Sequence, residues 1–310
     1  MRYIFPQSCS TFILNPITNK TNTIADSASE TPLSATNIHT HTMSATNLQY
    51  ATLDVFTDTR YTGNPLGLVH LPSNVKLSQE QKQTIAREFN YSETVFLHDA
   101  ADASKNEWTV DIFTKMKELP FAGHPTIGTT CYALSKAAGD TTSGTVTGTF
   151  NIKAGRVDLE YDVSTRKARV SIPHNVHIHS KPFSASELKA LHPYVPEGAE
   201  PPVVSIVNGM TFILVEMSDL EALATVQTTA KGPSKEGLDK EWSDTFLGVY
   251  FFTRLPDQSD GIRRVRTRMM SDQALEDPAT GSAVSRPPAR AWQYVRVAYF
   301  LLLSAPYSSQ

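Results

Sequence analysis

The chain has 310 residues, of which 40% are hydrophobic and 19% are charged, a composition that indicates a globular protein and excludes a charge-rich disordered one. Its 28 Lys and Arg residues nearly balance 31 Asp and Glu residues, so composition gives no sign of nucleic-acid binding. Cys9 and Cys131 lie far apart and form no CxxC pair, which excludes a disulfide framework and favours a reducing, cytoplasmic location. The longest apolar run, Val297 to Leu303, has seven residues. A bilayer-spanning helix needs about 20, so we expect no membrane span.

Residues 1–48 are rich in Ser, Thr and Asn and show neither helical nor strand periodicity. Such a segment buries too little apolar surface to offset its ordering entropy, and we expect a disordered N-terminal tail. It lacks the apolar region of a secretory signal and the Arg-rich pattern of a mitochondrial presequence. Met43 is an alternative start that the residues leave open.

Between the tail and residue 285 the pattern alternates between strands and helices. Ser78 followed by Gln81 has capping-box spacing, so a helix is expected from Gln79 to Phe89. Ser184 and Ser218 begin two shorter helices. The β-branched and apolar runs predict strands at 50–56, 67–71, 95–97, 108–114, 145–150, 156–163, 168–172, 203–207, 211–217, 246–252 and 262–269.

A further helix is expected from His124 to Ala138. Pro125 stands near its start and Gly139 just past its end, the asymmetry typical of helix termini. The segment carries one charged residue, Lys136, so most of its circumference must be buried and the helix must be central. Strands and helices do not alternate strictly as βαβ units, which favours an α+β fold over a doubly wound sheet.

One helix start occurs twice, roughly half the chain apart. The segments His124-Pro-Thr-Ile-Gly-Thr129 and Asp277-Pro-Ala-Thr-Gly-Ser282 share the form [His/Asp]-Pro-x-x-Gly-[Thr/Ser]. The free N–H groups and the dipole of a helix N-terminus attract carboxylates. Two such starts brought together could hold a small acid, although each hexapeptide alone is also ordinary turn-to-helix punctuation.

Four segments carry a resemblance to a known family. DVFT with the following GNPLGLV, AREFNYSETVFL, ELPFAGHPTIGT and EDPATGSA, in this order, resemble the PhzF-like (phenazine biosynthesis-like) isomerases of the diaminopimelate-epimerase-like superfamily. The similarity runs from about residue 49 to residue 283. It implies two pseudo-symmetric half-barrels, each around a central helix, over residues 49–174 and 175–285. It also implies an isomerase that needs neither a metal nor an organic cofactor, with its site where the two helix starts meet.

Glu93 is the candidate general base for removing a proton from carbon. It precedes an apolar strand and shares a strand face with Val95 and Leu97, so burial would raise its pKa toward neutrality. A solvated glutamate at a strand start is the alternative that the residues alone leave open. The resemblance assigns the general acid/base role to the glutamate of Ser92-Glu93-Thr94.

The resemblance also places His124 and Asp277 in the catalytic site. A histidine can relay protons near neutral pH, and a carboxylate can orient it or bind an amine. Both residues could equally cap their helices. The positions that match substrate-binding residues are Asn64, Gly123, Gly281 and Ser282.

Related two-thiol racemases carry a cysteine at each helix start, where this chain has Gly123 and Asp277, so thiol chemistry is not expected. Cys131 fits a buried, inert thiol within its helix.

Three histidines, His174, His177 and His179, form an H-x2-H-x-H pattern beside apolar residues. No Cys or acidic residue is near them in the sequence, so we expect no metal site and interpret the segment as an interdomain strand or linker. A run of four arginines between Arg263 and Arg268 alternates along an expected strand, which indicates a solvated face with an ion pair.

Residues 286–310 do not resemble the family. Prolines at 287 and 288 break the helix that should continue there, so the second half-barrel is expected to be incomplete and the last 25 residues atypical, as in a truncated or mis-spliced gene model.

The sequence therefore predicts proton transfer on a small carboxylate-bearing metabolite, with a homodimer left open. The alternative is a non-catalytic small-acid-binding or interaction protein.

Overall fold

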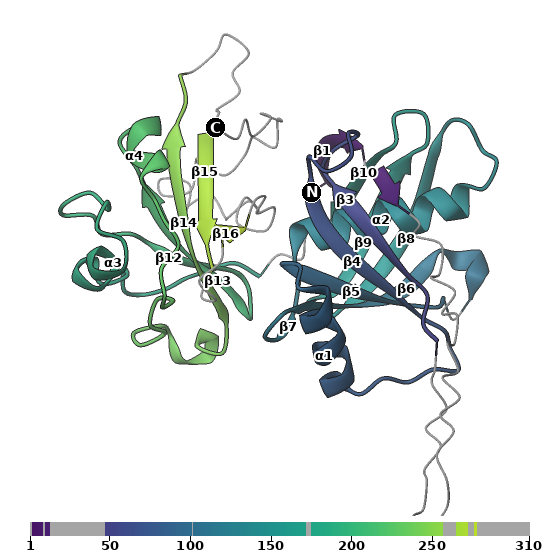
Figure 1. The fold of residues 1–310 in the computed structure, drawn as a ribbon, viewed down its shortest axis with the longest axis horizontal. Coiled ribbons are helices and arrows are strands. Elements are labelled where there is room, and N and C mark those ends of the chain that lie inside the picture. Colours follow the sequence, from purple (N-terminus) through teal and green to yellow (C-terminus); the bar gives the residue numbers. More distant parts are fainter. Residues whose placement is uncertain are drawn as a thin grey trace, which may run out of the picture.

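The structure is a computed structural model, which describes residues 2–8, 10–12, 47–100, 102–171, 175–256, 265–271 and 276–277. Its strands form two sheets, one in each half of the chain (Figure 1). The expected helix at Pro278, Gly281 and Ser282, as well as His174 and the atypical segment 286–310, lie outside the described residues.

The first sheet has ten strands, and its order is β1-β10-β9-β8-β6-β5-β4-β3-β2, with β7 paired to β6. The β4–β5 and β6–β8 pairs are parallel and the others antiparallel. The strands are β1 (Arg2–Ser8), β2 (Ser10–Phe12), β3 (Tyr50–Val55), β4 (Asn64–Leu71), β5 (Glu93–His98), β6 (Glu107–Thr114), β7 (Glu118–Leu119), β8 (Thr145–Ile152), β9 (Gly155–Asp162) and β10 (Lys167–Ser171).

Strands β1 and β2 differ from the disordered tail that composition predicted for residues 1–48. They lie at the two ends of the sheet, β1 against β10 and β2 against β3, although one residue separates them in the sequence. The sheet therefore curls until its ends meet. Each strand forms hydrogen bonds with the backbone N–H and C=O groups of an otherwise open sheet edge. Side-chain composition does not predict this stabilisation, because it comes from the backbone.

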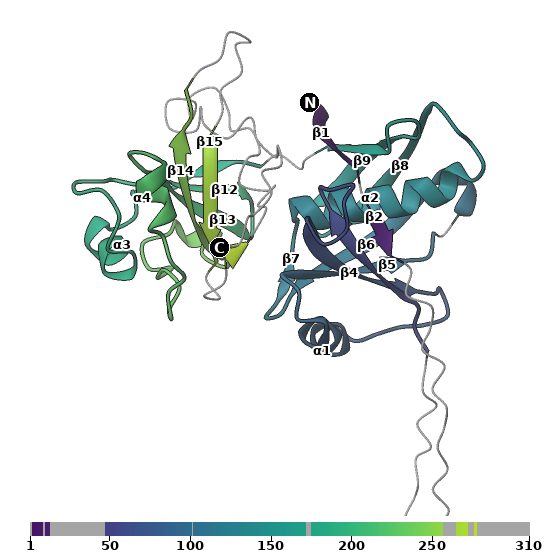
Figure 2. The same ribbon diagram turned by 45° about the horizontal axis from the view of Figure 1, so that its top comes forward.

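Helix α2 (Gly123–Ala138) lies inside this curl (Figure 2) and contacts strands from both ends of the sheet, including β3, β4, β9 and β10. Every residue from Gly123 to Leu134 is buried, which confirms the predicted central helix. Gly128 permits the close approach, because a Cβ there would lie 2.6 Å from Val55 Cγ2 and 2.9 Å from Leu66 Cδ2. The helix ends at Gly139, as expected.

Helix α1 (Gln79–Phe89) covers the opposite face of the first sheet. Its Ser78–Gln81 capping box is present. Ala86 packs with Val69, Phe96 and Phe113 in a separate core. Alternate residues of β5 therefore face different helices, and Val95 and Leu97 belong to the core around α2. A short 3-10 helix, η1 (Ala103–Lys105), precedes β6.

Over the described residues the second sheet has six strands in the order β11-β12-β13-β14-β15-β16, with only the β13–β14 pair parallel. Its described helices lie on one face (Figure 1). The elements are β11 (His177–Ile178), α3 (Ala185–Leu191), β12 (Val203–Val207), β13 (Met210–Glu216), α4 (Leu220–Ala224), η2 (Lys240–Trp242), β14 (Phe246–Arg254), β15 (Val265–Met270) and β16 (Glu276–Asp277).

The two halves share one hydrophobic core and one order of pairing. Residues of the second sheet such as Phe212 and Tyr250 belong to the same buried cluster as Ile127 of α2. In each half an antiparallel hairpin is followed by a helix, a parallel strand, an antiparallel strand and a two-residue strand, β3 to β7 and β12 to β16. Among the described residues, no helix combines the length and apolar character needed to cross a bilayer.

Candidate active site

Glu93 is the first residue of β5, on the strand face that points toward α2. Its neighbours on that face, Val95 and Leu97, are buried, and the Glu93 side chain is only 13% exposed. The predicted strand parity is therefore correct, and a carboxyl group sits at the edge of an apolar core.

His124 lies in the first turn of α2 and faces Glu93. Its Nδ1 is 3.5 Å from Glu93 Oε2, and its side chain is 2% exposed. Ala122 occupies the N-cap position and provides no side-chain hydrogen bond, so His124 does not stand in the capping position that was its alternative role. Gly123, the other first-turn residue predicted for the site, is buried beside it.

Asp277 reaches the same place from the second half of the chain. Asn64, the first residue of β4, donates a hydrogen bond from Nδ2 to Asp277 Oδ1 at 3.2 Å, across 213 positions of sequence. Asn64 is itself 2% exposed. The structure thus brings together four of the predicted site residues that it describes, Asn64, Glu93, His124 and Asp277.

The position of Asp277 is fixed by its neighbours in the second sheet. Asp277 pairs with Met269 in the β15–β16 hairpin. Arg268, one of the predicted run of arginines, binds Glu276 through two hydrogen bonds of 2.7 Å and also donates to backbone carbonyls at the end of α4 and beyond, including Val226 O. Bidentate arginine–carboxylate pairs have a defined geometry, so this pair orients β16. Arg268 makes the ion pair predicted for the arginine run, whereas positions 263 and 264 lie outside the described residues.

The environment raises the pKa of Glu93 to about 8. Burial is the main cause, since it disfavours the charged carboxylate, and the negative charge of Asp277 adds to it; the Ser92 hydroxyl opposes both. At neutral pH the side chain is mostly a neutral carboxylic acid, and a minor ionised fraction is always present. Such a group can give and take protons in the same pH range.

His124 shifts the opposite way. Burial lowers its pKa to about 4, against the opposing influence of Asp277 and the Pro65 carbonyl, so the imidazole is neutral near pH 7. A neutral imidazole has one donor and one acceptor nitrogen, which lets it pass a proton without carrying a charge. The two side chains thus form an acid/imidazole pair whose pKa values are moved apart by their surroundings.

Several polar atoms of this cluster lack partners within the described protein. Among the residues that the structure describes, six buried side-chain oxygen or nitrogen atoms have no hydrogen-bond partner, and three of them are Asn64 Oδ1, Glu93 Oε2 and His124 Nε2. Buried polar groups are almost always paired, with water or a ligand where the protein offers nothing. Three such atoms therefore lie in one cluster of predicted site residues, where a polar ligand would find donors and acceptors.

Tyr250 on β14 is a member of this surrounding that sequence reasoning missed. Burial and the charge of Asp277 raise its pKa to about 12, against a hydrogen bond with Thr267. The residue lies in an apolar strand segment, FLGVYFF, so it reads as a core residue. Its hydroxyl group was the only feature that could have indicated a role in the site. Cys131, by contrast, is buried within α2, as predicted.

A second cluster, separate in its residues from the first, joins two of the histidines for which no metal site was expected. His177, His179 and Asp239 place three ligand atoms within 4.8 Å of one another. Asp239, on the loop before β14, is the acidic residue that the sequence around the histidines lacks.

The chain is similar to a known protein family and to several known proteins. A model of the family described as phenazine biosynthesis-like proteins matches residues 53–293. A curated protein named as an uncharacterized isomerase of Mesorhizobium japonicum is 30% identical over 246 residues, which cover 76% of this chain and 78% of that protein. A trans-2,3-dihydro-3-hydroxyanthranilate isomerase of Pseudomonas chlororaphis is 41% identical over 83 residues, 26% of this chain and 27% of that enzyme.

Solved structures agree in fold. A predicted epimerase from Pseudomonas aeruginosa has a TM-score of 0.59 at 24% identity, covering 80% of this chain and 82% of that one. A PhzF-family phenazine biosynthesis protein from Bacillus anthracis has a TM-score of 0.52 at 21% identity and covers 79% of each chain. The chain therefore shares the mixed α/β architecture with a curled sheet that these proteins have.

Proposed function

The chain belongs to the family of phenazine biosynthesis-like proteins, and on that premise we propose that it is an isomerase that moves a proton within a small carboxylate-bearing metabolite. Glu93 is the proposed general acid/base, with His124 and Asp277 beside it. The proposed chemistry uses only side chains and backbone groups of the chain. The supporting relatives are named as isomerases or epimerases.

The observation that carries this proposal is the environment of Glu93. Its carboxyl is 13% exposed, 3.5 Å from a buried imidazole, and its pKa is raised to about 8. A structural glutamate gains nothing from such a place, because burial without a partner costs folding free energy. A proton-transfer group gains a pKa close to the working pH.

The proposed proton transfer has two steps. The ionised Glu93 removes a proton from a substrate carbon, and the electron pair left behind spreads into the adjacent unsaturated system of the substrate. The protonated Glu93 then returns a proton to a different atom of that system, which regenerates the carboxylate and leaves an isomer. Nothing is oxidised or reduced, so the step needs no second reactant.

The neighbouring groups have distinct proposed roles. Neutral His124 offers Nε2, which has no partner among the described residues, to a polar group of the substrate or to the moving proton. Asp277, held by Asn64, raises the basicity of Glu93 and can bind a substrate amine or hydroxyl. The uncapped start of α2 at Gly123 favours a substrate carboxylate. Binding roles for Gly281 and Ser282 remain predictions from the resemblance.

We further propose that the two halves are pseudo-symmetric half-barrels over 49–174 and 175–285. The shared order of strand pairing, from β3 to β7 and from β12 to β16, supports this, as does the position of His124 shortly after β7 and of Asp277 within β16.

The test measures exchange of carbon-bound hydrogen with solvent in D2O, by NMR, first with trans-2,3-dihydro-3-hydroxyanthranilate and then with a panel of small unsaturated carboxylic acids. Glu93→Gln should slow exchange at least about 100-fold, because it keeps the shape and removes the proton-transfer group. Glu118→Gln is the matched control, since the Glu118 side chain is similarly covered at 16% exposure but pairs with Lys153.

Equal exchange by Glu93→Gln and the native chain would refute the proposal. Binding of these acids without any exchange in the native chain would instead favour the non-catalytic small-acid-binding alternative.

A further inference from the structure

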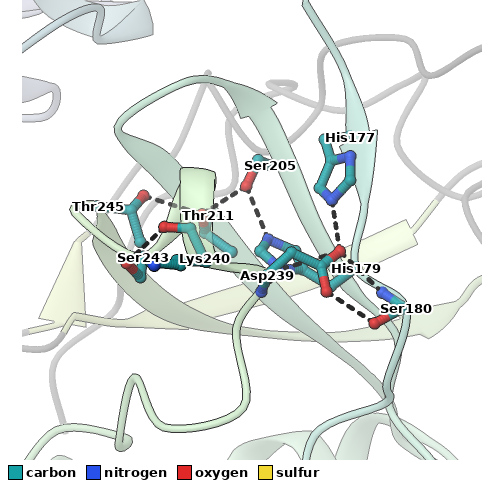
Figure 3. Close-up of polar contacts among 9 residues, drawn as sticks. All are labelled: His177, His179, Ser180, Ser205, Thr211, Asp239, Lys240, Ser243 and Thr245. Atoms are coloured by element: carbon teal, nitrogen blue, oxygen red, sulfur yellow. Dashed lines mark hydrogen bonds and ion pairs between the residues drawn. The ribbon is translucent and has the colours of Figure 1, made fainter.

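We propose that His177, His179 and Asp239 form a binding site for a divalent first-row transition-metal ion such as Zn²⁺. Figure 3 shows the side chains of His177, His179 and Asp239 close together. The two histidines come from one segment and Asp239 from another, 60 positions after His179.

The two histidines have the spacing of a strand chelate. His177 belongs to β11, and the next residues continue the pairing, since His179 N donates to Val203 O at 3.0 Å. Residues i and i+2 of a strand point to the same face, so both imidazoles are presented together. A third ligand is then enough for an open site of the kind that holds zinc through three side chains and a water.

Asp239 supplies that third ligand at a suitable distance. Its Oδ2 lies 2.6 Å from His177 Nε2 and 4.0 Å from His179 Nδ1. Neighbouring ligand atoms around a tetrahedral zinc ion are about 3.4 Å apart, given metal–ligand distances of about 2.0–2.1 Å. The present separations lie on both sides of this value, so small side-chain rotations can admit an ion.

The hydrogen bonds around His179 fix its tautomer. Each hydroxyl group can donate only one proton. Thr245 Oγ1 donates its proton to a backbone carbonyl, so Thr211 must donate to Thr245, and Ser205 must in turn donate to Thr211. His179 Nε2 must then donate to Ser205 Oγ, 3.0 Å away. The proton is therefore on Nε2 and the lone pair of Nδ1 faces Asp239 (Figure 3).

The other two ligands are also held by outer groups. Ser180 donates its N–H and its hydroxyl to the Asp239 carboxylate, at 3.1 and 2.7 Å. Trp242 stacks on the His177 ring, with centroids 4.6 Å apart and planes at 6°. Such outer contacts orient metal ligands and are typical of metal sites. The site is also accessible, because the side chains of His177 and Asp239 are 31% and 28% exposed.

The donor set indicates the class of ion. Two imidazole nitrogens and one carboxylate oxygen suit zinc and its first-row neighbours rather than Mg²⁺ or Ca²⁺, which prefer all-oxygen sites. Binding has two identified costs. The ion must replace the hydrogen bond from Asp239 N to His179 Nδ1 at 3.0 Å, and it must also replace the one that His177 Nε2 donates to Asp239 Oδ2 at 2.6 Å, which requires Nε2 to give up its proton. The alternative interpretation is that the three side chains only hold β11 and the loop that carries Asp239 together through hydrogen bonds, without a metal ion.

The test uses the full chain without a polyhistidine tag, stripped with EDTA and dialysed. Zn²⁺ titration followed by calorimetry should give about one ion per chain, and Co²⁺ should give the visible absorption of a tetrahedral site. His177→Gln and Asp239→Asn should each weaken Zn²⁺ binding at least about tenfold.

His98→Gln is the matched control and should bind Zn²⁺ as the native chain does. His98 is similarly exposed, 33%, and lies 2.7 Å from the Asp111 carboxylate, but Lys82 rather than a second histidine accompanies that pair. Failure of the native chain to bind Zn²⁺, or undiminished binding by a folded His177→Gln variant, would overturn the proposal. Circular dichroism verifies folding, and His177→Gln decides the question if Asp239→Asn does not fold.

Discussion

Two histidine–carboxylate pairs in this chain differ in nearly every physical respect. In the His124–Glu93 pair the atoms are 3.5 Å apart, both side chains are almost fully covered, and Glu93 Oε2 has no hydrogen-bond partner in the part of the chain that the structure describes. In the His177–Asp239 pair the atoms are 2.6 Å apart, both side chains are partly exposed, and Ser180 donates twice to the carboxylate.

The same chemical groups therefore have opposite properties. Burial raises the pKa of Glu93 to about 8, whereas hydrogen bonds from Ser180 and His177 lower the pKa of Asp239 to about 2. Satisfied hydrogen bonds stabilise a charge, and burial without them destabilises it. The first pair is suited to moving protons and the second to keeping a fixed negative charge that can hold a cation.

The largest effect that would test this comparison is expected in the stability of the Glu93→Gln variant. A carboxyl whose folded-state pKa is raised stabilises the fold below its unfolded value of 4.5, and this contribution is lost as the pH rises toward 8. Removing the titration should make Glu93→Gln more stable than the native chain at pH 8, by on the order of 2 kcal/mol, with the difference disappearing near pH 4. Urea unfolding at the two pH values measures this.

A variant less stable than the native chain at pH 8 would show that the Glu93 carboxylate is stabilised rather than strained. The exchange experiment is independent of this one, because activity and stability should change in opposite directions.

The sequence predicted the first pair better than the second, for a physical reason. Glu93 and His124 were found because a strand start, a helix start and a family resemblance are all local patterns. Ser78–Gln81 and Gly139 marked helix ends for the same reason. Contacts between residues that only the tertiary fold brings together have no local sequence pattern from which to predict them.

Asp239 is the clearest of these contacts. It contacts His177 from a loop 62 positions away, and no sequence pattern near either residue predicts this contact. The strands Arg2–Ser8 and Ser10–Phe12 are similar, since their backbones pair with open sheet edges that composition does not describe. The hydrogen bond from Asn64 to Asp277 likewise joins two residues predicted separately.

The second test is Asp239→Asn in the presence of EDTA, which should change stability in the opposite direction from Glu93→Gln. The amide keeps one acceptor oxygen, but its NH2 group faces donors that the carboxylate satisfied. We expect a loss of about 1–2 kcal/mol in the free energy of unfolding at pH 7. Glu241→Gln, on the exposed side of η2, is a control that should stay within about 0.5 kcal/mol of the native value.

If Asp239→Asn were as stable as the native chain, the carboxylate would contribute no net hydrogen bonding. The hydrogen bonds from Ser180 would then not account for the difference between the two pairs.

The smallest expected effect concerns the single hydrogen bond that ties the first pair to the second half of the chain. Asn64→Ala removes the donor to Asp277 Oδ1, a bond of 3.2 Å made by a side chain that is 2% exposed. Because the amide is buried and its Oδ1 has no partner among the residues described, the loss should be limited to about 1 kcal/mol, less than a fully paired buried asparagine would give. Asn208→Ala is matched to it, since Asn208 donates a longer, exposed bond of 3.4 Å to Glu241 O and should change stability by less. Thermal unfolding of both variants at pH 7 compares them directly. An Asn64→Ala variant that unfolds at the native temperature, with unchanged exchange activity, would mean that Asn64 does not hold Asp277 against Glu93.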